Sequence, residues 1–159
     1  MNDTRLIIYL NDHLALMVGE IELADRCESS NRETPLGEFL HRLGVEIEAQ
    51  KSIVSDVIRR AGGSESTIKK GAAWFAEKLG RFKLNDSVLT YSDLSRVIEL
   101  EALSAAAQER VALWDTLNAV AAGDGRFTGI TFSFFRDQSQ QQFEELGSRR
   151  RYAATQAFS

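Results

Sequence analysis

Apolar residues recur at every third or fourth position along four long stretches of the chain, a spacing that predicts α-helices. We expect these helices at about residues 4–29, 35–61, 92–121 and 131–157. A shorter stretch at about 66–82 has the same periodicity, with Lys, Arg and Glu between its apolar positions. We interpret it as an additional short helix that lies against the other four. The pattern therefore predicts an all-α fold.

The helix predicted at 35–61 has the clearest ends. Thr34 can cap it, and Pro35 fits its first turn, where a missing N–H costs nothing. Gly62 and Gly63 follow it, and glycine readily adopts the left-handed conformation that ends a helix. These signals place a sharp boundary on each side of the helix.

The helix predicted at 92–121 carries apolar residues on two faces, so we expect it to be covered on both sides. One face contains Leu94, Ile98, Ala105 and Ala112, and the other contains Val97, Leu100, Val111 and Trp114. Phenylalanines also gather at the start of the helix predicted at 131–157. Together these features leave apolar surface that a second copy can cover, and we therefore expect a homodimer.

The lengths of the connections predict how the helices are arranged. Few residues join the first helix to the second, around 29–34, and few join the last two helices, around 123–129. Each of these pairs should therefore be antiparallel. A connection of roughly thirty residues separates the second long helix from the third, so these two should run parallel. Two antiparallel hairpins joined by one long crossover form the ferritin-like four-helix bundle.

Four parts of the sequence carry a resemblance to a known group of proteins. They are YLNDHL at 9–14, TPLGEF at 34–39, AWFAEKLG at 73–80, and IELEAL at 98–103 with ALW at 112–114. In these motifs the chain resembles an uncharacterised family of bacterial ferritin-like proteins, which is similar to the stress-associated branch of that superfamily. The resemblance implies the same bundle over most of the chain. It implies no particular chemistry.

Length, charge and cysteine content narrow the class of protein. A chain of 159 residues is the size of one domain, which we assign to residues 1–159. Asp and Glu outnumber Lys and Arg by 23 to 19, and the net charge of −4 argues against nucleic-acid binding. No stretch approaches the ~20 apolar residues of a membrane span. The single cysteine, Cys27, cannot form an intrachain disulfide. We expect a cytoplasmic protein.

A ferritin-like bundle raises the question of a di-iron or di-manganese centre. Such a centre needs a carboxylate from each of two helices and a Glu-x-x-His motif from each of the other two. We expect an inward polar cluster of Glu20, Glu46, Gln50, Glu101 and Gln108. Three of these residues are carboxylates from three helices, which favours a metal. The candidate ligands are Glu20, Glu46, Glu101 and His13.

The rest of the ligand set is absent from the expected positions. The sequence has one Glu-x-x-His motif, Glu38 to His41, on the face opposite the apolar stripe of its helix. On the last helix, Ser139 and Gln142 are the residues that point inward. We therefore expect no metal cofactor and no catalytic residue, and instead a hydrogen-bonded cluster.

The sequence thus favours a non-catalytic bundle that serves as an interaction or stress-associated protein. The alternative is an atypical carboxylate-rich metal-binding enzyme or metal-storage protein, with its site at Glu20, Glu46 and Glu101. A third class, a carrier of a lipid or small ligand, would need a cavity that the sequence cannot show. The run Arg149-Arg150-Arg151 is a further candidate, for a patch that binds an anion or a nucleic acid. Because consecutive helical residues point in different directions, we expect these arginines to form a solvated, salt-bridged surface instead.

Overall fold

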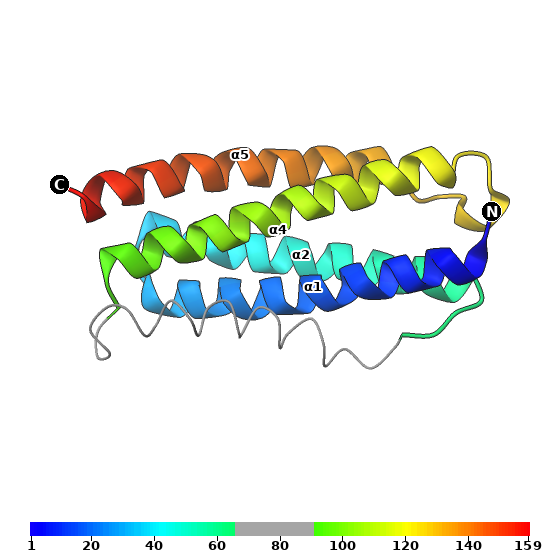
Figure 1. Cartoon of the computed structure of the whole chain (residues 1–159), viewed down its shortest axis with the longest axis horizontal. Helices are drawn as coiled ribbons and strands as arrows, with labels where there is room; N and C mark the ends of the chain where they lie inside the picture. The colour runs from blue at the N-terminus through cyan, green and yellow to red at the C-terminus, as the bar shows by residue number, and fades with distance from the viewer. Residues whose placement is uncertain (66–90) are drawn as a thin grey trace.

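The computed structural model describes residues 1–65 and 91–159. In these ranges the chain forms four long helices and one short 3-10 helix (Figure 1): α1 (Asp3–Ser30), α2 (Pro35–Arg60), α4 (Asp93–Val120), η1 (Gly125–Phe127) and α5 (Phe132–Ala157). No strand occurs in the described ranges. The all-α fold class and the four long helices are confirmed. The additional helix expected at 66–82 lies outside the described residues.

Side-chain caps determine where α2 and α4 begin. The Thr34 hydroxyl accepts a hydrogen bond from the backbone N–H of Gly37 at 3.1 Å, and Pro35 occupies the first turn as predicted. At the start of α4, the Ser92 hydroxyl accepts from the N–H of Ser95 at 3.1 Å. Each cap satisfies one of the N–H groups that have no partner inside the helix.

The link between α1 and α2 is tight. The hydroxyl of Thr34 donates to the carbonyl oxygen of Asn31 at 2.7 Å. That same carbonyl lies so close to Gly37 that a Cβ at this position would overlap it, so only glycine fits. The first turn of α2 is therefore held directly against the end of α1, and the two helices are antiparallel.

The helices pack as two hairpins, α1 with α2 and α4 with α5, and contact between α1 and α4 joins them. In Figure 1, α2 and α4 both start at the end of the bundle where α1 meets α2 and run toward the other end. The prediction that these two helices run parallel is confirmed. The described helices include none that is long and apolar enough to cross a membrane.

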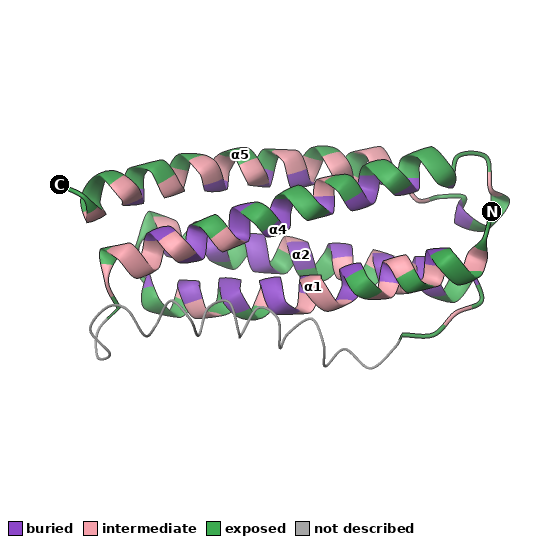
Figure 2. Cartoon of the chain, in the orientation of Figure 1, coloured by how far each residue is buried: buried purple, intermediate pink, exposed green. Residues whose placement is uncertain are grey.

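Buried residues follow the sides of the helices that face one another (Figure 2). On α4 they recur at spacings of three or four: Val97, Leu100, Leu103, Ala107, Arg110, Trp114 and Leu117. The opposite face of this helix is open, with Ala105 and Ala112 exposed. The expectation that both apolar faces are covered is wrong for Ala105 and Ala112, and among the described helices α1 and α5 pack against the other side of α4.

Candidate functional site

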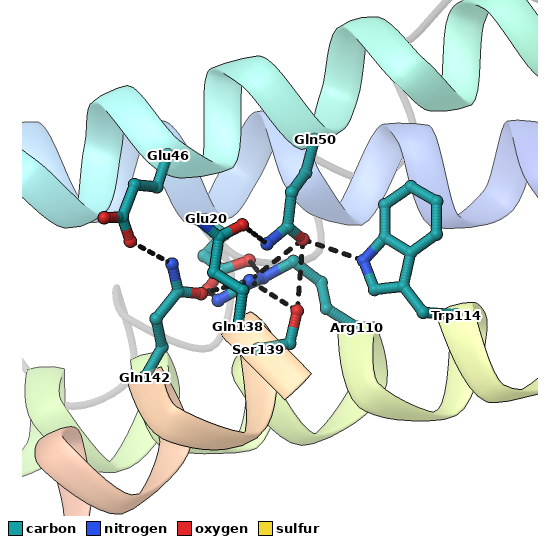
Figure 3. Close-up of polar contacts among 8 residues, drawn as sticks. All are labelled: Glu20, Glu46, Gln50, Arg110, Trp114, Gln138, Ser139 and Gln142. Carbon is teal, nitrogen blue, oxygen red and sulfur yellow. Dashed lines mark hydrogen bonds and ion pairs between the residues drawn. The ribbon is translucent and has the colours of Figure 1, made fainter. Parts of the chain in front are cut away.

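Polar side chains from all four long helices meet in the middle of the bundle (Figure 3). We call this group the arginine cluster, and its members are Glu20 of α1, Glu46 and Gln50 of α2, Arg110 and Trp114 of α4, and Gln138, Ser139 and Gln142 of α5. Glu46 and Gln138 are half-buried and form its rim, and the other members are buried. The cluster is the largest polar group that the described core contains.

A buried ion pair lies at the centre of the cluster. Arg110 donates from Nε to Glu20 Oε2 at 2.8 Å and from Nη2 to Glu20 Oε1 at 3.0 Å. Arg110 and Glu20 are each 1% exposed. Two parallel N–H···O bonds of this kind combine charge attraction with the planar geometry that the guanidinium and carboxylate share. The pair is therefore held in one orientation between α1 and α4.

The remaining nitrogen of the guanidinium connects Arg110 to the other two helices. Nη1 donates to Gln50 Oε1 at 3.2 Å, to Ser139 Oγ at 3.1 Å and to Gln142 Oε1 at 2.5 Å. Every nitrogen of the guanidinium thus has a partner. Because a buried unpaired charge is very costly, this complete set of partners is what allows an arginine to lie in an apolar core.

Gln50 is the second centre of the cluster. Its Oε1 accepts from Trp114 Nε1 at 2.8 Å and from Ser139 Oγ at 3.1 Å, besides the bond from Arg110. Its Nε2 donates to Gln138 Oε1 at 2.8 Å. The amide therefore uses both of its ends, and the indole N–H of the buried Trp114 finds an acceptor inside the core.

The cluster reaches solvent at Glu46. Gln142 Nε2 donates to Glu46 Oε2 at 2.5 Å, and the Glu46 side chain is half-buried. Glu46 therefore belongs to the edge of the cluster, and no hydrogen bond or ion pair joins it to Arg110. The two carboxylates of the cluster have different surroundings, because Glu20 faces a guanidinium in a dry core and Glu46 faces an amide near water.

Burial and the ion pair act in opposite directions on Glu20. Burial raises the pKa of the Glu20 carboxyl because the charged form loses its hydration, whereas the charge and hydrogen bonds of Arg110 lower it. On balance the pKa of the Glu20 carboxyl is raised, because the loss of hydration outweighs the attraction of Arg110. The two hydrogen bonds from Arg110 are the contacts that stabilise the charged form against this loss.

The structure brings together three of the residues expected in the inward cluster, Glu20, Glu46 and Gln50. Ser139 and Gln142, which the pattern on α5 also placed inward, join them. Glu101 and Gln108 do not: both are exposed, and Glu101 accepts a bond from Arg150 at 3.5 Å on the surface. The prediction that they point inward is wrong, because it assumed that the face of α4 carrying them meets the bundle, and that face is open.

His13 lies inside the bundle but apart from the cluster. It is buried, and its ring packs edge-on against Tyr9 with the ring centroids 4.5 Å apart. Burial lowers the pKa of His13, and the nearby charges of Glu109 and Asp12 oppose this only in part. The polar contacts of the arginine cluster do not include its imidazole.

Arg110 is the central residue that the sequence analysis missed. Its signal is present in the chain: Arg110 follows Leu103 and Ala107 and precedes Trp114 and Leu117 at spacings of three or four. A cation at this spacing within an apolar stripe indicates a buried charge that needs a carboxylate partner. Glu20, at a comparable position on α1, is that partner.

The cluster does not fit a di-metal centre. It offers one buried carboxylate, whose two oxygens are both bonded to a guanidinium, and it has amide and hydroxyl groups where a centre of this kind needs histidines and further carboxylates. Residues 1–65 and 91–159 contain no group of three or more His, Cys, Asp or Glu side chains arranged to hold a metal ion.

A second polar group surrounds Cys27. Its Sγ donates to Glu99 Oε2 at 2.9 Å, and Arg26 holds the other oxygen of Glu99 through Nε at 3.1 Å and Nη2 at 2.9 Å. Burial, together with the adjacent Glu99 carboxylate, strongly raises the pKa of the Cys27 thiol. Because the thiolate is the nucleophile, this protonated thiol is unsuited to catalysis.

The arrangement of these two groups is that of satisfied polar contacts within a core. Comparison with family models, with curated proteins and with solved structures finds no match to this chain. The resemblance to ferritin-like proteins therefore stays a prediction, and the function has to be inferred from the geometry.

Proposed function

We propose that this chain is a ferritin-like helical-bundle protein without a di-iron or di-manganese centre, serving as a non-catalytic interaction or stress-associated protein. The observation that supports this proposal most directly is the Arg110 guanidinium in the middle of the bundle, bonded to both oxygens of Glu20. In a di-metal bundle protein the inward carboxylates of this region bind cations. Here a side-chain cation is already bound to the one carboxylate of the cluster that is fully buried.

Electrostatics argues against adding a metal ion beside Arg110. A guanidinium stays charged at every physiological pH. At a separation of 4 Å it repels each unit of positive charge by roughly 4 kcal/mol in a partly buried setting. A divalent ion at Glu20 would have to overcome this repulsion or displace Arg110, which would then lose its bonds to Gln50, Ser139 and Gln142.

The alternative of an atypical metal site at Glu20, Glu46 and Glu101 lacks geometric support. Glu101 is exposed and bonded to Arg150, and Glu46 is bonded to an amide at the rim of the cluster. The three carboxylates therefore do not converge, and His13 lies beside Tyr9 instead of beside them.

We further propose that the protein is cytoplasmic and self-associates as a homodimer. The open face of α4 supports the second point, because Ala105 and Ala112 are exposed there and Leu94 and Ile98 are only half-buried. Sedimentation velocity over a broad range of micromolar concentrations tests it. A species that stays monomeric throughout would exclude the homodimer.

Elemental analysis of protein purified without chelators or an affinity tag tests the absence of a metal centre. We expect iron, manganese and zinc to be far below one ion per chain. Two ions per chain, as in a di-metal bundle, would overturn the proposal if they were lost in the Glu20→Ala variant. Glu101→Ala is the matched control, because it removes an exposed carboxylate outside the cluster.

A further inference from the structure

A pocket is lined by residues of the link between α1 and α2, of the start of α4 and of the last turns of α5. These segments meet at one end of the bundle (Figure 1). The volume of the pocket is about 550 Å³, which is within the range of small-molecule sites. Two arginines, Arg96 of α4 and Arg149 of α5, line it. None of the described residues that line it is acidic. The charged side chains that line the pocket are therefore both cations, although each is also paired with a carboxylate outside the lining, Asp93 or Glu145.

Both arginines are held in place by neighbouring groups. Arg96 donates from Nε to Asn31 Oδ1 at 2.9 Å and from Nη1 to Asp93 Oδ1 at 2.7 Å. Asn31 is itself fixed, because its Nδ2 donates to the carbonyl oxygen of Cys27 at 2.7 Å. An arginine positioned in this way loses little conformational freedom when it binds a ligand.

Arg149 is positioned by three different contacts. Its guanidinium lies over the ring of Phe39 at 4.3 Å from the centroid, Nη1 donates to the Pro35 carbonyl at 3.2 Å, and Nη2 donates to Glu145 at 2.8 Å. Its Nε is buried and has no hydrogen-bond acceptor among the described residues. That nitrogen is enclosed by protein, so a ligand in the pocket would meet the part of the Arg149 side chain that stays exposed.

The remaining wall of the pocket combines apolar and hydroxyl groups. Pro35, Leu36 and Ala153 provide apolar surface, and the largely exposed Tyr152 adds an aromatic residue to the lining. Thr34 and Ser148 add hydroxyl groups. Apolar surface next to fixed cations suits a ligand with one charged end and one apolar body.

We propose that this pocket binds a small organic anion, with a carboxylate or phosphate group facing Arg96 and Arg149 and an aromatic or similarly flat body against Tyr152 and Pro35. The sequence analysis expected the arginine run at 149–151 to form a solvated, salt-bridged surface, and the proposal changes this interpretation for Arg149. Arg149 faces the pocket, whereas Arg150 reaches the surface carboxylate of Glu101 at 3.5 Å.

Isothermal titration of the full chain with phenyl phosphate, benzoate and inorganic phosphate tests the proposal. We expect saturable binding of phenyl phosphate or benzoate with a Kd of about 1 mM or tighter. The stronger of these two probes identifies whether phosphate or carboxylate is the preferred group. Binding of inorganic phosphate should be weaker, because it cannot use the apolar wall. Absence of saturable binding by both aromatic anions would overturn the proposal.

Three variants that each remove one positive charge distinguish binding in the pocket from general attraction of an anion to the charged surface. Arg96→Gln and Arg149→Gln should each weaken binding of the aromatic anion at least about tenfold, because each removes a charged hydrogen-bond donor. Arg150→Gln should leave binding unchanged. Equal weakening by all three variants would show diffuse attraction to the arginine run and overturn the proposed site. Far-UV circular dichroism of each variant checks folding, and Arg96→Gln remains informative if loss of the Phe39 contact unfolds Arg149→Gln.

Discussion

Replacing Arg110 by Met should destabilise the protein more than any substitution of a surface arginine. The methionine fills much of the same volume but leaves the Glu20 carboxylate, 1% exposed, without a cation. Breaking a buried ion pair by removing one partner costs about 3–5 kcal/mol. For a chain of this size, each kcal/mol lowers Tm by roughly 2–4 °C, so we expect a fall of about 6–20 °C.

The assay is thermal and urea unfolding followed by far-UV circular dichroism, with Arg150→Met as control. Arg150 reaches the exposed Glu101 at 3.5 Å, and an ion pair of this kind contributes less than about 1 kcal/mol. The double variant Glu20→Leu/Arg110→Met should be more stable than Arg110→Met alone, because no buried charge remains. A loss below about 1 kcal/mol for Arg110→Met, or a double variant whose loss equals the sum of the two single losses, would refute the reasoning.

The pH dependence of Arg110→Met gives an independent check. Burial raises the pKa of Glu20, and the substitution removes the charge that opposes this rise. The folded state then binds a proton more readily than the unfolded state, so the stability of the variant should fall as pH rises above the ordinary glutamate pKa of about 4.3. Arg110→Met should therefore recover part of its stability in mild acid, and a loss that does not depend on pH would contradict the buried-charge explanation.

Other parts of the bundle give further expectations. Burial lowers the pKa of His13, so the unfolded state binds a proton more readily than the folded state, and stability should fall as pH drops below about 6.5. His13→Asn should make stability depend less steeply on pH in this range. An equal pH dependence in variant and parent would contradict the buried, neutral state of His13. The thiol of Cys27, buried against Glu99, should react with a thiol reagent only on unfolding, and rapid labelling of the native protein would contradict this. Trp114→Phe removes the donor to Gln50 and should cost about 1–3 kcal/mol in urea unfolding, whereas an unchanged midpoint would show that this bond is dispensable.

The ends of the helices could be predicted because they depend on local chemistry. Thr34, Pro35 and Ser92 act through hydrogen bonds and backbone angles within a few residues of themselves, and these effects can be recognised in the sequence. The relative directions of the helices followed from the lengths of their connections. Both kinds of inference need no knowledge of how distant parts of the chain pack.

The orientation of α4 about its own axis could not be determined in the same way. Both of its faces are apolar, so periodicity alone does not decide which face meets the bundle, and Glu101 was placed inside although it is exposed. Arg110 was missed for a related reason. An arginine is assigned to the surface unless its partner is known, and the partner, Glu20, lies 90 residues away in the sequence. A contact of this range depends on the packing of the two hairpins.

The buried ion pair also limits how the two hairpins can slide along each other. One helical turn corresponds to 5.4 Å, and a shift of this size would move Arg110 from Glu20 toward Met17 or Leu23, which are buried and apolar. An unpaired guanidinium in such a place is strongly unfavourable, whereas leucine against leucine tolerates many alignments. Hairpins that meet out of alignment during folding should therefore separate again, because the correct alignment is the one in which the charge is neutralised.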